Sequence, residues 1–357
     1  MKRLIFILAI LATGVASAMA QQAVAVLTHA GTTKTFDGYT ALQDAYKEAA
    51  SGDLITLSSG TFASVATIEK ALTIRGAGME YDSIYHTQAT ILEGDITLDV
   101  PQSESGHFQL EGIWHDNVFY YTHVQNNPQF TKCRLKSFKY AQYSELGSNY
   151  IGRVVNAHFF QCKIVFNLDC QENCSISCIN CYVGHPYTWS ETTSTIYLQN
   201  CLVSVYTGAY SYSNISYGTN YSSQLYGSSI KNCIFVDNNI PSLYFKDNTT
   251  FINCLFPSHS TYYKPETAKN IYQRYENIQV VFDTYTGNYT DDEDFLMRDA
   301  VKSVYCDENG SELGMYGGNF PYTPRLAGPH LKYFDAASHS TTDGKLRVRV
   351  QVDTTLE

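Results

Sequence analysis

The segment Ile230–Asn239 reads IKNCIFVDNN, and near-copies of it recur along the chain. Aligning the copies on their shared cysteine gives a column made of Cys133, Cys162, Cys181, Cys201, Cys233 and Cys254. The residue before each cysteine is, in the same order, Lys132, Gln161, Asn180, Asn200, Asn232 and Asn253. Three residues before each cysteine and two residues after it, every copy has an apolar residue or another cysteine. This regularity predicts a repeat protein.

The spacing of the cysteines sets the length of the repeat. They lie 29, 19, 20, 32 and 21 residues apart, which indicates a unit of about twenty residues with two insertions. Counting one unit back from Cys133 reaches Ile113, with Gly112 before it, so the array extends in that direction. A unit of this length, with short strands joined by tight bends, is typical of one coil of a parallel β-helix.

The parity of the columns predicts a bend inside each unit. On a strand, side chains at even offsets share one face. The apolar column at −3 and the columns at 0 and +2 differ in parity, so all three point inward only if the chain bends before the cysteine. Asn and Gly fill five of the seven −1 positions, and both tolerate the left-handed backbone that such a bend requires.

The cysteine column is expected to serve shape rather than chemistry. Cysteine is small, apolar and commonly buried, so it suits a crowded inner position beside a bend. Side chains stacked in register point the same way, which predicts that most of these cysteines are free thiols. We therefore assign a structural role to the cysteine column and to Asn180, Asn200, Asn232 and Asn253.

A second cysteine cluster, CQENCSISCINC, allows two further interpretations. Cys174, Cys178 and Cys181 have the spacing with which radical enzymes bind an iron–sulfur cluster, and Cys170 adds a fourth thiolate suited to zinc. Cys178 and Cys181 already occupy inner columns, however, so a disulfide from Cys170 or Cys174 across the intervening turn is the favoured expectation. We predict no metal and no cofactor.

The N-terminus has the features of an export signal. Lys2 and Arg3 precede an apolar run, Leu4–Val15, and Ala18-Met19-Ala20 provides a small-x-small cleavage site. Residues 1–20 are therefore predicted to be a signal peptide that directs the chain to the periplasm, cell surface or exterior. The run is too short to span a bilayer, and no transmembrane segment is predicted. The net charge of −10 argues against a nucleic-acid partner.

One helix is predicted near the start, in TALQDAYKEAASGD. Thr40 and Gln43 have the spacing of a capping box, and Gly52 follows as a helix stop. Four residues repeat at the helical period and predict one buried stripe, namely Leu42, Ala45, Tyr46 and Ala49.

This segment and the repeats together carry a family resemblance. YTALQDAYKEAASGDLITLSSGTF followed by KALTIRGAG resembles the opening of secreted bacterial β-helix proteins of the pectate-lyase-like superfamily. DFLMRDAVKSVYCDENGSELGMYGG resembles the closing segment that follows such solenoids. The resemblance implies an all-β fold, a right-handed single-stranded parallel β-helix over residues 21–261 with an N-terminal capping helix. Residues 262–357 would form a C-terminal capping segment over the last coil or a small module, with a strand in KLRVRVQV.

The resemblance is weaker for activity, because this superfamily includes lyases, hydrolases and adhesins. Its catalytic motifs have no match at corresponding positions of this chain. Between residues 109 and 259 the acidic residues are Glu111, Asp116, Glu145, Asp169, Glu172, Glu191, Asp237 and Asp247. None shares an offset within the repeat with another in the way that paired catalytic carboxylates require. We therefore assign no catalytic residue, and we expect His115, which falls in the +2 column, to be buried.

The aromatic residues suggest a binding function instead. The chain contains 29 Tyr and 18 Phe, and several aromatic residues lie beside the repeated columns rather than in them. We predict that they bind a polysaccharide or another cell-surface glycan, with packing between insertions as the alternative role. The candidates are Trp114, Tyr120, Tyr121, Tyr187, Trp189, Tyr206, Tyr210 and Tyr212. The alternative function is that of a polysaccharide lyase or glycoside hydrolase.

Overall fold

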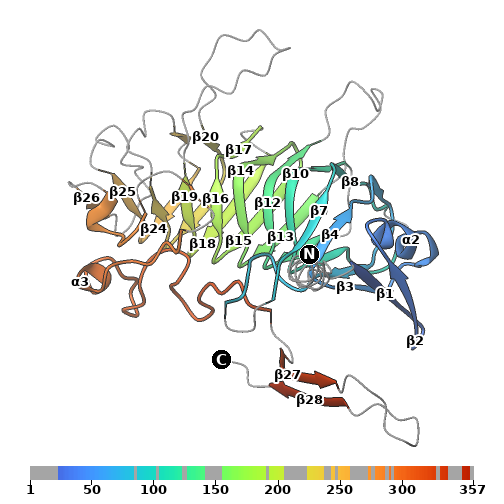
Figure 1. Ribbon diagram of the computed structural model, residues 1–357. Helices are drawn as coiled ribbons and strands as arrows, with labels where there is room; N and C mark the ends of the chain where they lie inside the picture. Colours follow the sequence, from blue (N-terminus) through green and yellow to red (C-terminus); the bar gives the residue numbers. More distant parts are fainter. Residues whose placement is uncertain are drawn as a thin grey trace, which may run out of the picture.

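The structure is a computed structural model of the chain. It describes residues 23–83, 87–101, 104–122, 127–140, 155–189, 193–204, 223–236, 243–245, 248–257, 272–274, 278–285, 289–290, 293–326, 330–336 and 348–353. The described part is built mainly of parallel strands stacked side by side (Figure 1).

The first long sheet, sheet A, takes one strand from each successive unit. Its order is β2 (Thr32–Asp37), β1 (Val24–His29), β3 (Leu54–Leu57), β6 (Thr73–Arg75), β9 (Gln109–Glu111), β11 (Gln129–Thr131), β13 (Val155–Phe160), β15 (Cys174–Ile179), β18 (Thr195–Gln199), β21 (Ser229–Lys231) and β24 (Thr250–Ile252). Strand β1 is antiparallel to both of its neighbours, and all pairs from β3 onward are parallel.

The second long sheet, sheet B, follows the same sequence order. Its main path is β4 (Gly60–Ala63), β7 (Thr90–Glu93), β10 (Trp114–Tyr121), β12 (Arg134–Tyr140), β14 (Lys163–Cys170), β16 (Tyr182–Gly184), β19 (Leu202–Ser204), β22 (Ile234–Phe235), β25 (Leu255–Pro257) and β26 (Tyr272–Arg274). Strand β26 pairs in parallel with β25, so the parallel strands continue past the expected boundary at residue 261.

A third strip of strands branches from sheet B. It consists of β5 (Thr67–Ile68), β8 (Ile96–Leu98), the C-terminal halves of β10, β12 and β14, then β17 (Pro186–Thr188), β20 (Ser223–Leu225) and β23 (Leu243–Phe245). We call this strip the third face. Strands that return unit after unit to the same sheets are consistent with a solenoid-like β-helix.

The bends lie at the predicted −1 positions. Gly112, Lys132, Gln161, Asn180, Asn200, Asn232 and Asn253 all have a positive φ, between 50° and 65°. On either side of the bend the predicted inner columns are buried: the six ladder cysteines are fully buried, and so are Phe130 and Leu135 in the same unit. A left-handed residue therefore turns the chain from sheet A into sheet B in each of these seven units, as the parity argument requires.

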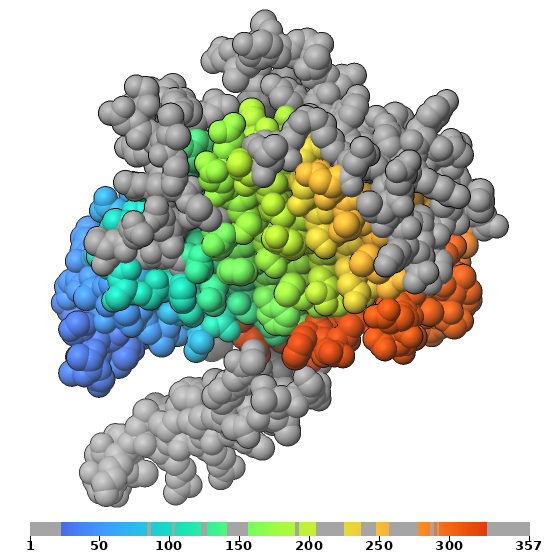
Figure 2. Space-filling view, turned by 180° about the vertical axis from the view of Figure 1, so that it is seen from behind, coloured from blue at the N-terminus to red at the C-terminus, as the bar shows by residue number. Residues whose placement is uncertain are grey.

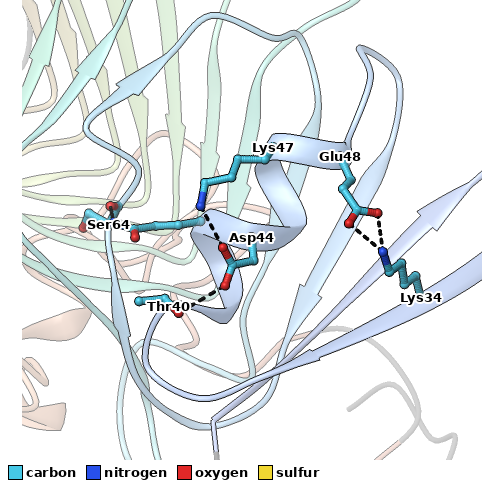
Figure 3. A network of polar contacts seen from close by, with 7 residues as sticks. Lys34, Thr40, Asp44, Lys47, Glu48 and Ser64 are labelled. Carbon is cyan, nitrogen blue, oxygen red and sulfur yellow. Dashed lines mark hydrogen bonds and ion pairs between the residues drawn. The ribbon is translucent and has the colours of Figure 1, made fainter.

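The predicted helix is present as α2 (Ala41–Glu48) and packs against the first strands. Of the predicted stripe, Leu42, Ala45 and Ala49 are buried, and Tyr46 is only partly buried. The predicted capping box is wrong. The Thr40 hydroxyl donates to the Asp44 carboxylate (Figure 3). The Gln43 amide donates to the Ser64 carbonyl. The helix ends at Glu48, before Gly52.

The C-terminal part does not stop at the last coil. The described residues between Ile278 and Leu326, which we call the strap, run back along the outside of sheet B toward the first coils (Figures 1 and 2). The strap includes η2 (Ile278–Val280) and the short helix α3 (Asp299–Lys302). Its apolar residues form a second core with outward side chains of sheet B, among them Tyr182, Leu202, Ile234 and Leu255. The strap thus reaches beyond the last coil, which was the part of the solenoid that the closing segment was expected to cover.

A hairpin follows the strap. Strands β27 (His330–Ala336) and β28 (Val348–Asp353) are antiparallel, and β28 overlaps the predicted strand KLRVRVQV. No helix within the described ranges is long and apolar enough to cross a membrane.

Candidate functional site

The third face aligns four side chains from four neighbouring strands. Tyr120 on β10 pairs with Lys139 on β12, and Asp169 on β14 pairs with Tyr187 on β17. Lys139 and Asp169 directly follow Phe138 and Leu168, which are themselves a register pair. Neighbouring strands lie about 4.8 Å apart, so Tyr120, Lys139, Asp169 and Tyr187 form a continuous row of about 14 Å. We call these four residues the outer row.

Burial shows which way the outer row points. Phe119, Phe138 and Leu168, each one position earlier, are fully buried in the core. Tyr121, Cys170 and Thr188, each one position after a member of the row, are also fully buried. The four residues of the outer row are all partly exposed. Because side chains alternate along a strand, the outer row lies on the outside of the third face.

Asp169 is the acidic residue of the outer row, and its pKa is shifted. Burial raises the pKa of its carboxyl group to about 6, and the positive charge of Lys139 opposes this shift. The backbone of Asp169 is fixed from inside, since the Tyr121 hydroxyl donates to its carbonyl oxygen at 2.8 Å. The carboxyl group therefore changes its charge near pH 6, on a backbone that Tyr121 holds in place.

Trp189 extends the aromatic part of this face. Its side chain is 46 % exposed, and its ring lies 5.2 Å from that of Tyr187 in an edge-on arrangement. The Trp189 backbone N–H donates to the Cys170 carbonyl at 2.9 Å, which ties the residue to strand β14. Tyr187 and Trp189 thus present two adjoining rings at one end of the outer row.

The predicted binding residues separate into four groups. Tyr120, Tyr187 and Trp189 lie on the third face. Tyr121 does not: its side chain is fully buried, so the prediction that it contacts a ligand is wrong. Trp114 lies at the start of β10, where the Arg134 guanidinium covers its ring at 4.5 Å. The remaining candidates, Tyr206, Tyr210 and Tyr212, fall outside the described residues.

Sequence reasoning missed Lys139 and Asp169 as partners in one row. Counted from the inner column at Ile113, Cys133, Cys162 and Cys181, the outer row falls at offsets of seven, six, seven and six residues. The register shifts between β10 and β12 and again between β12 and β14, which accounts for the difference. Such an irregularity exchanges the two faces for every later residue. The alternation in Phe138-Lys139 and Leu168-Asp169 was the signal available.

The cysteine ladder is part of the core. The six ladder cysteines donate S–H bonds to backbone carbonyls, as Cys201 does to Cys178 at 3.3 Å. Burial raises the pKa of the Cys133, Cys181 and Cys233 thiols well above the usual value. Such thiols are poor nucleophiles and poor metal ligands.

The second cysteine cluster is also buried. Cys170 and Cys174 are free thiols, and the Cys170 thiol donates to the Cys174 carbonyl at 3.2 Å. The expected disulfide from one of these residues is therefore wrong. Among the described residues, no group of three or more His, Cys, Asp or Glu side chains is placed to hold a metal ion.

His115 lies in the core, as its column predicts. It is fully buried, its Nε2 atom lies 2.8 Å from the Gly94 carbonyl oxygen, and burial lowers the pKa of the ring. A neutral, hydrogen-bonded histidine in this place supports the packing of β10.

Comparison with known proteins adds no relative. No family model matches the chain, and no curated protein or solved structure matches it either. The fold and the chemistry of the third face are therefore the evidence on function.

Proposed function

We propose that this chain is an exported, right-handed parallel β-helix of the pectate-lyase-like superfamily that binds a glycan on its third face. The left-handed bends, the stacked inner columns and a helix packed on the first strands support the assignment of fold, with α2 as the N-terminal cap. The glycan proposal depends on one observation: Tyr120 from one repeat and the pair Tyr187 and Trp189 from another lie on one face. Lys139 and Asp169 lie between them.

The outer row offers the mixture of contacts that a sugar chain requires. Tyrosine and tryptophan rings present flat apolar surfaces with a polar edge, which suits the C–H face of a sugar ring. The Lys139 ammonium group donates hydrogen bonds, and the ionised Asp169 carboxylate accepts them from hydroxyl groups. Because the row crosses the strands, the bound glycan would run along the solenoid axis with one contact for each coil.

Alanine substitution of the exposed aromatic residues tests the binding proposal. A glycan array identifies a ligand, and titration calorimetry then compares the Tyr187→Ala and Trp189→Ala variants with the unmodified chain. We expect each variant to bind at least about tenfold more weakly. A central aromatic contact contributes roughly 1.4 kcal/mol or more to the binding free energy. Tyr197→Ala is the matched control, since Tyr197 is 47 % exposed but lies on sheet A. Equal binding by all three variants, or an array without any ligand, would contradict the proposal.

Asp169 supports a second candidate function, that of a polysaccharide lyase or glycoside hydrolase. A carboxyl group with a pKa of about 6 beside an ammonium group is suited to proton transfer near neutral pH. Polysaccharides containing uronic acids would be incubated with the chain and assayed for unsaturated products and for new reducing ends. Activity that Asp169→Asn abolishes, with glycan binding retained, would favour an enzyme over a binding protein.

A further inference from the structure

The strap contacts the solenoid through the residues that form its bends. The Asn232 amide donates to the Asp307 carboxylate, and the Asn180 amide donates to the carbonyls of Met315 and Gly317 at 2.9 and 2.8 Å. Further along the strap, the Gln161 amide donates to the Pro321 carbonyl, and the Lys132 ammonium group donates to the Arg325 carbonyl. Later residues of the strap thus meet earlier coils, in order.

The strap also covers an ion pair between Lys163 on β14 and Glu80, in which the lysine is buried. The Lys163 ammonium group lies 2.5 Å from a carboxylate oxygen of Glu80, and the Lys163 side chain is 3 % exposed. Rings of the strap residues Phe295 and Tyr322 each lie 5.7 Å from the same ammonium group. The Tyr322 hydroxyl also donates to Glu80 at 3.4 Å, and Arg325 pairs with Asp82 at 3.4 Å. The strap is therefore joined to the segment between β6 and β7, near the N-terminal end of the solenoid.

These contacts link coils that are not neighbours in the solenoid. In a repeat array each coil touches only its neighbours, so a local perturbation fades with distance along the axis. We propose that the strap is a brace that couples the first coils to the last ones, with the Lys163–Glu80 pair as its lock. Loss of the lock then loosens the strap along its whole length, including its distant contact where the Gly314 N–H donates to the Asn232 carbonyl at 2.9 Å.

Hydrogen exchange of the complete chain tests this coupling. Glu80→Gln leaves the Lys163 charge buried without its partner, which is strongly unfavourable. We expect amides in residues 313–317 and in Ser229–Phe235 to exchange about tenfold faster in this variant, because the opening free energy there falls by about 1.4 kcal/mol. Arg75→Gln is the matched control: it breaks the Arg75–Glu111 pair between neighbouring coils on sheet A and leaves the Lys163–Glu80 pair intact. It should leave both distant segments unchanged.

Two results would overturn the brace. One is faster exchange in Glu80→Gln that is confined to residues near Glu80 and Lys163, with residues 313–317 unaffected. The other is an equal effect of Arg75→Gln on the distant segments. If Glu80→Gln does not fold, Gln161→Ala replaces it, because this change removes only the amide contacts to Phe320 and Pro321. The control for Gln161→Ala is Gln199→Ala, at an exposed position of β18. Hydrogen exchange in residues 313–317 and Ser229–Phe235 again decides the outcome.

Discussion

At the scale of single residues, the position before each ladder cysteine performs two tasks. Its backbone forms the left-handed bend, and at several coils its side chain also holds the strap. Asn serves both tasks, since it tolerates positive φ and has an amide donor. Lys132 and Gln161 depart from this pattern where they reach strap carbonyls, which explains why less suitable residues occupy a left-handed position.

Substitutions at Asn180 separate the two tasks. Asn180→Gly keeps the left-handed backbone but loses two hydrogen bonds to the strap, so we expect it to cost about 1–3 kcal/mol of unfolding free energy. Asn180→Val loses the same bonds and adds backbone strain of about 1–3 kcal/mol more. Urea denaturation measures both values. If the valine variant were as stable as the glycine variant, the bend would not require a residue that tolerates positive φ.

Asp169 gives the stability of the chain a pH dependence with a defined sign. Its carboxyl pKa is raised from 3.8 to about 6 on folding, so the native state holds the proton more tightly than the unfolded state. Stability should therefore fall as the pH rises from about 4 to about 6, by at most about 3 kcal/mol from this group. Denaturation of the unmodified chain and of Asp169→Asn across this interval tests the sign. As the pH rises, the unfolding free energy of Asp169→Asn should increase relative to that of the unmodified chain. A difference that stays constant with pH would contradict the shifted pKa.

The ladder thiols should resist alkylation in the folded chain. Burial keeps reagents out and raises the pKa of Cys133, Cys181 and Cys233, which suppresses the reactive thiolate. Iodoacetamide without reductant should leave these residues unmodified in buffer and label them in concentrated urea. Mass spectrometry distinguishes the two states. Ladder cysteines that remain unlabelled in urea until a reductant is added would instead be disulfide-bonded.

At the scale of elements, local patterns predicted the strands better than their faces. The twenty-residue spacing located β11, β13, β15, β18, β21 and β24 because each precedes a marked bend. The third face was harder to derive, since register shifts in β10, β12 and β14 change the parity of every following residue. Tyr121 was assigned outward and Asp169 was left unassigned for this reason. A bulge depends on how two strands pair, which a single repeat does not encode.

Helix α2 gives a prediction at this scale, because its stability comes from packing rather than from its surface charges. Leu42 is 1 % exposed in the core, and Leu42→Ala should cost about 2–5 kcal/mol. Glu48→Gln breaks the exposed pair with Lys34 (Figure 3) and should change stability by less than about 1 kcal/mol. Thermal unfolding of both variants compares the two effects. A larger loss in Glu48→Gln would show that the helix is held by its surface network.

At the scale of the whole molecule, the strap is the feature that the sequence did not reveal. The apolar residues of the strap do not recur at a regular spacing in the sequence. They contact side chains of sheet B that become neighbours only when the coils stack. The strap covers the outward-facing side chains of sheet B at four positions and so removes them from water. These positions are Tyr182, Leu202, Ile234 and Leu255. Read from sequence alone, this apolar column has no visible partner.

The ladder cysteines provide a test of how the whole molecule unfolds, since they are spaced along the axis. With the strap in place, Cys133 and Cys254 should become accessible to alkylation over the same range of urea concentration, in a single transition. In an array without such a brace the terminal coils would open first. Mass spectrometry of samples labelled at increasing urea concentrations follows each cysteine. Separate midpoints for Cys254 and Cys133 would indicate independent unfolding of the two ends.

The sequence by itself determined the repeat, the left-handed bends and the buried columns. These depend on relations within about twenty residues, where backbone preference and side-chain parity act directly. Only the tertiary structure decided the outer row and the path of the strap. Both bring together residues from different coils, and Lys163 meets Glu80 and Tyr322 across 83 and 159 residues of chain. Such contacts arise from stacking and from strand register, which local preference does not fix.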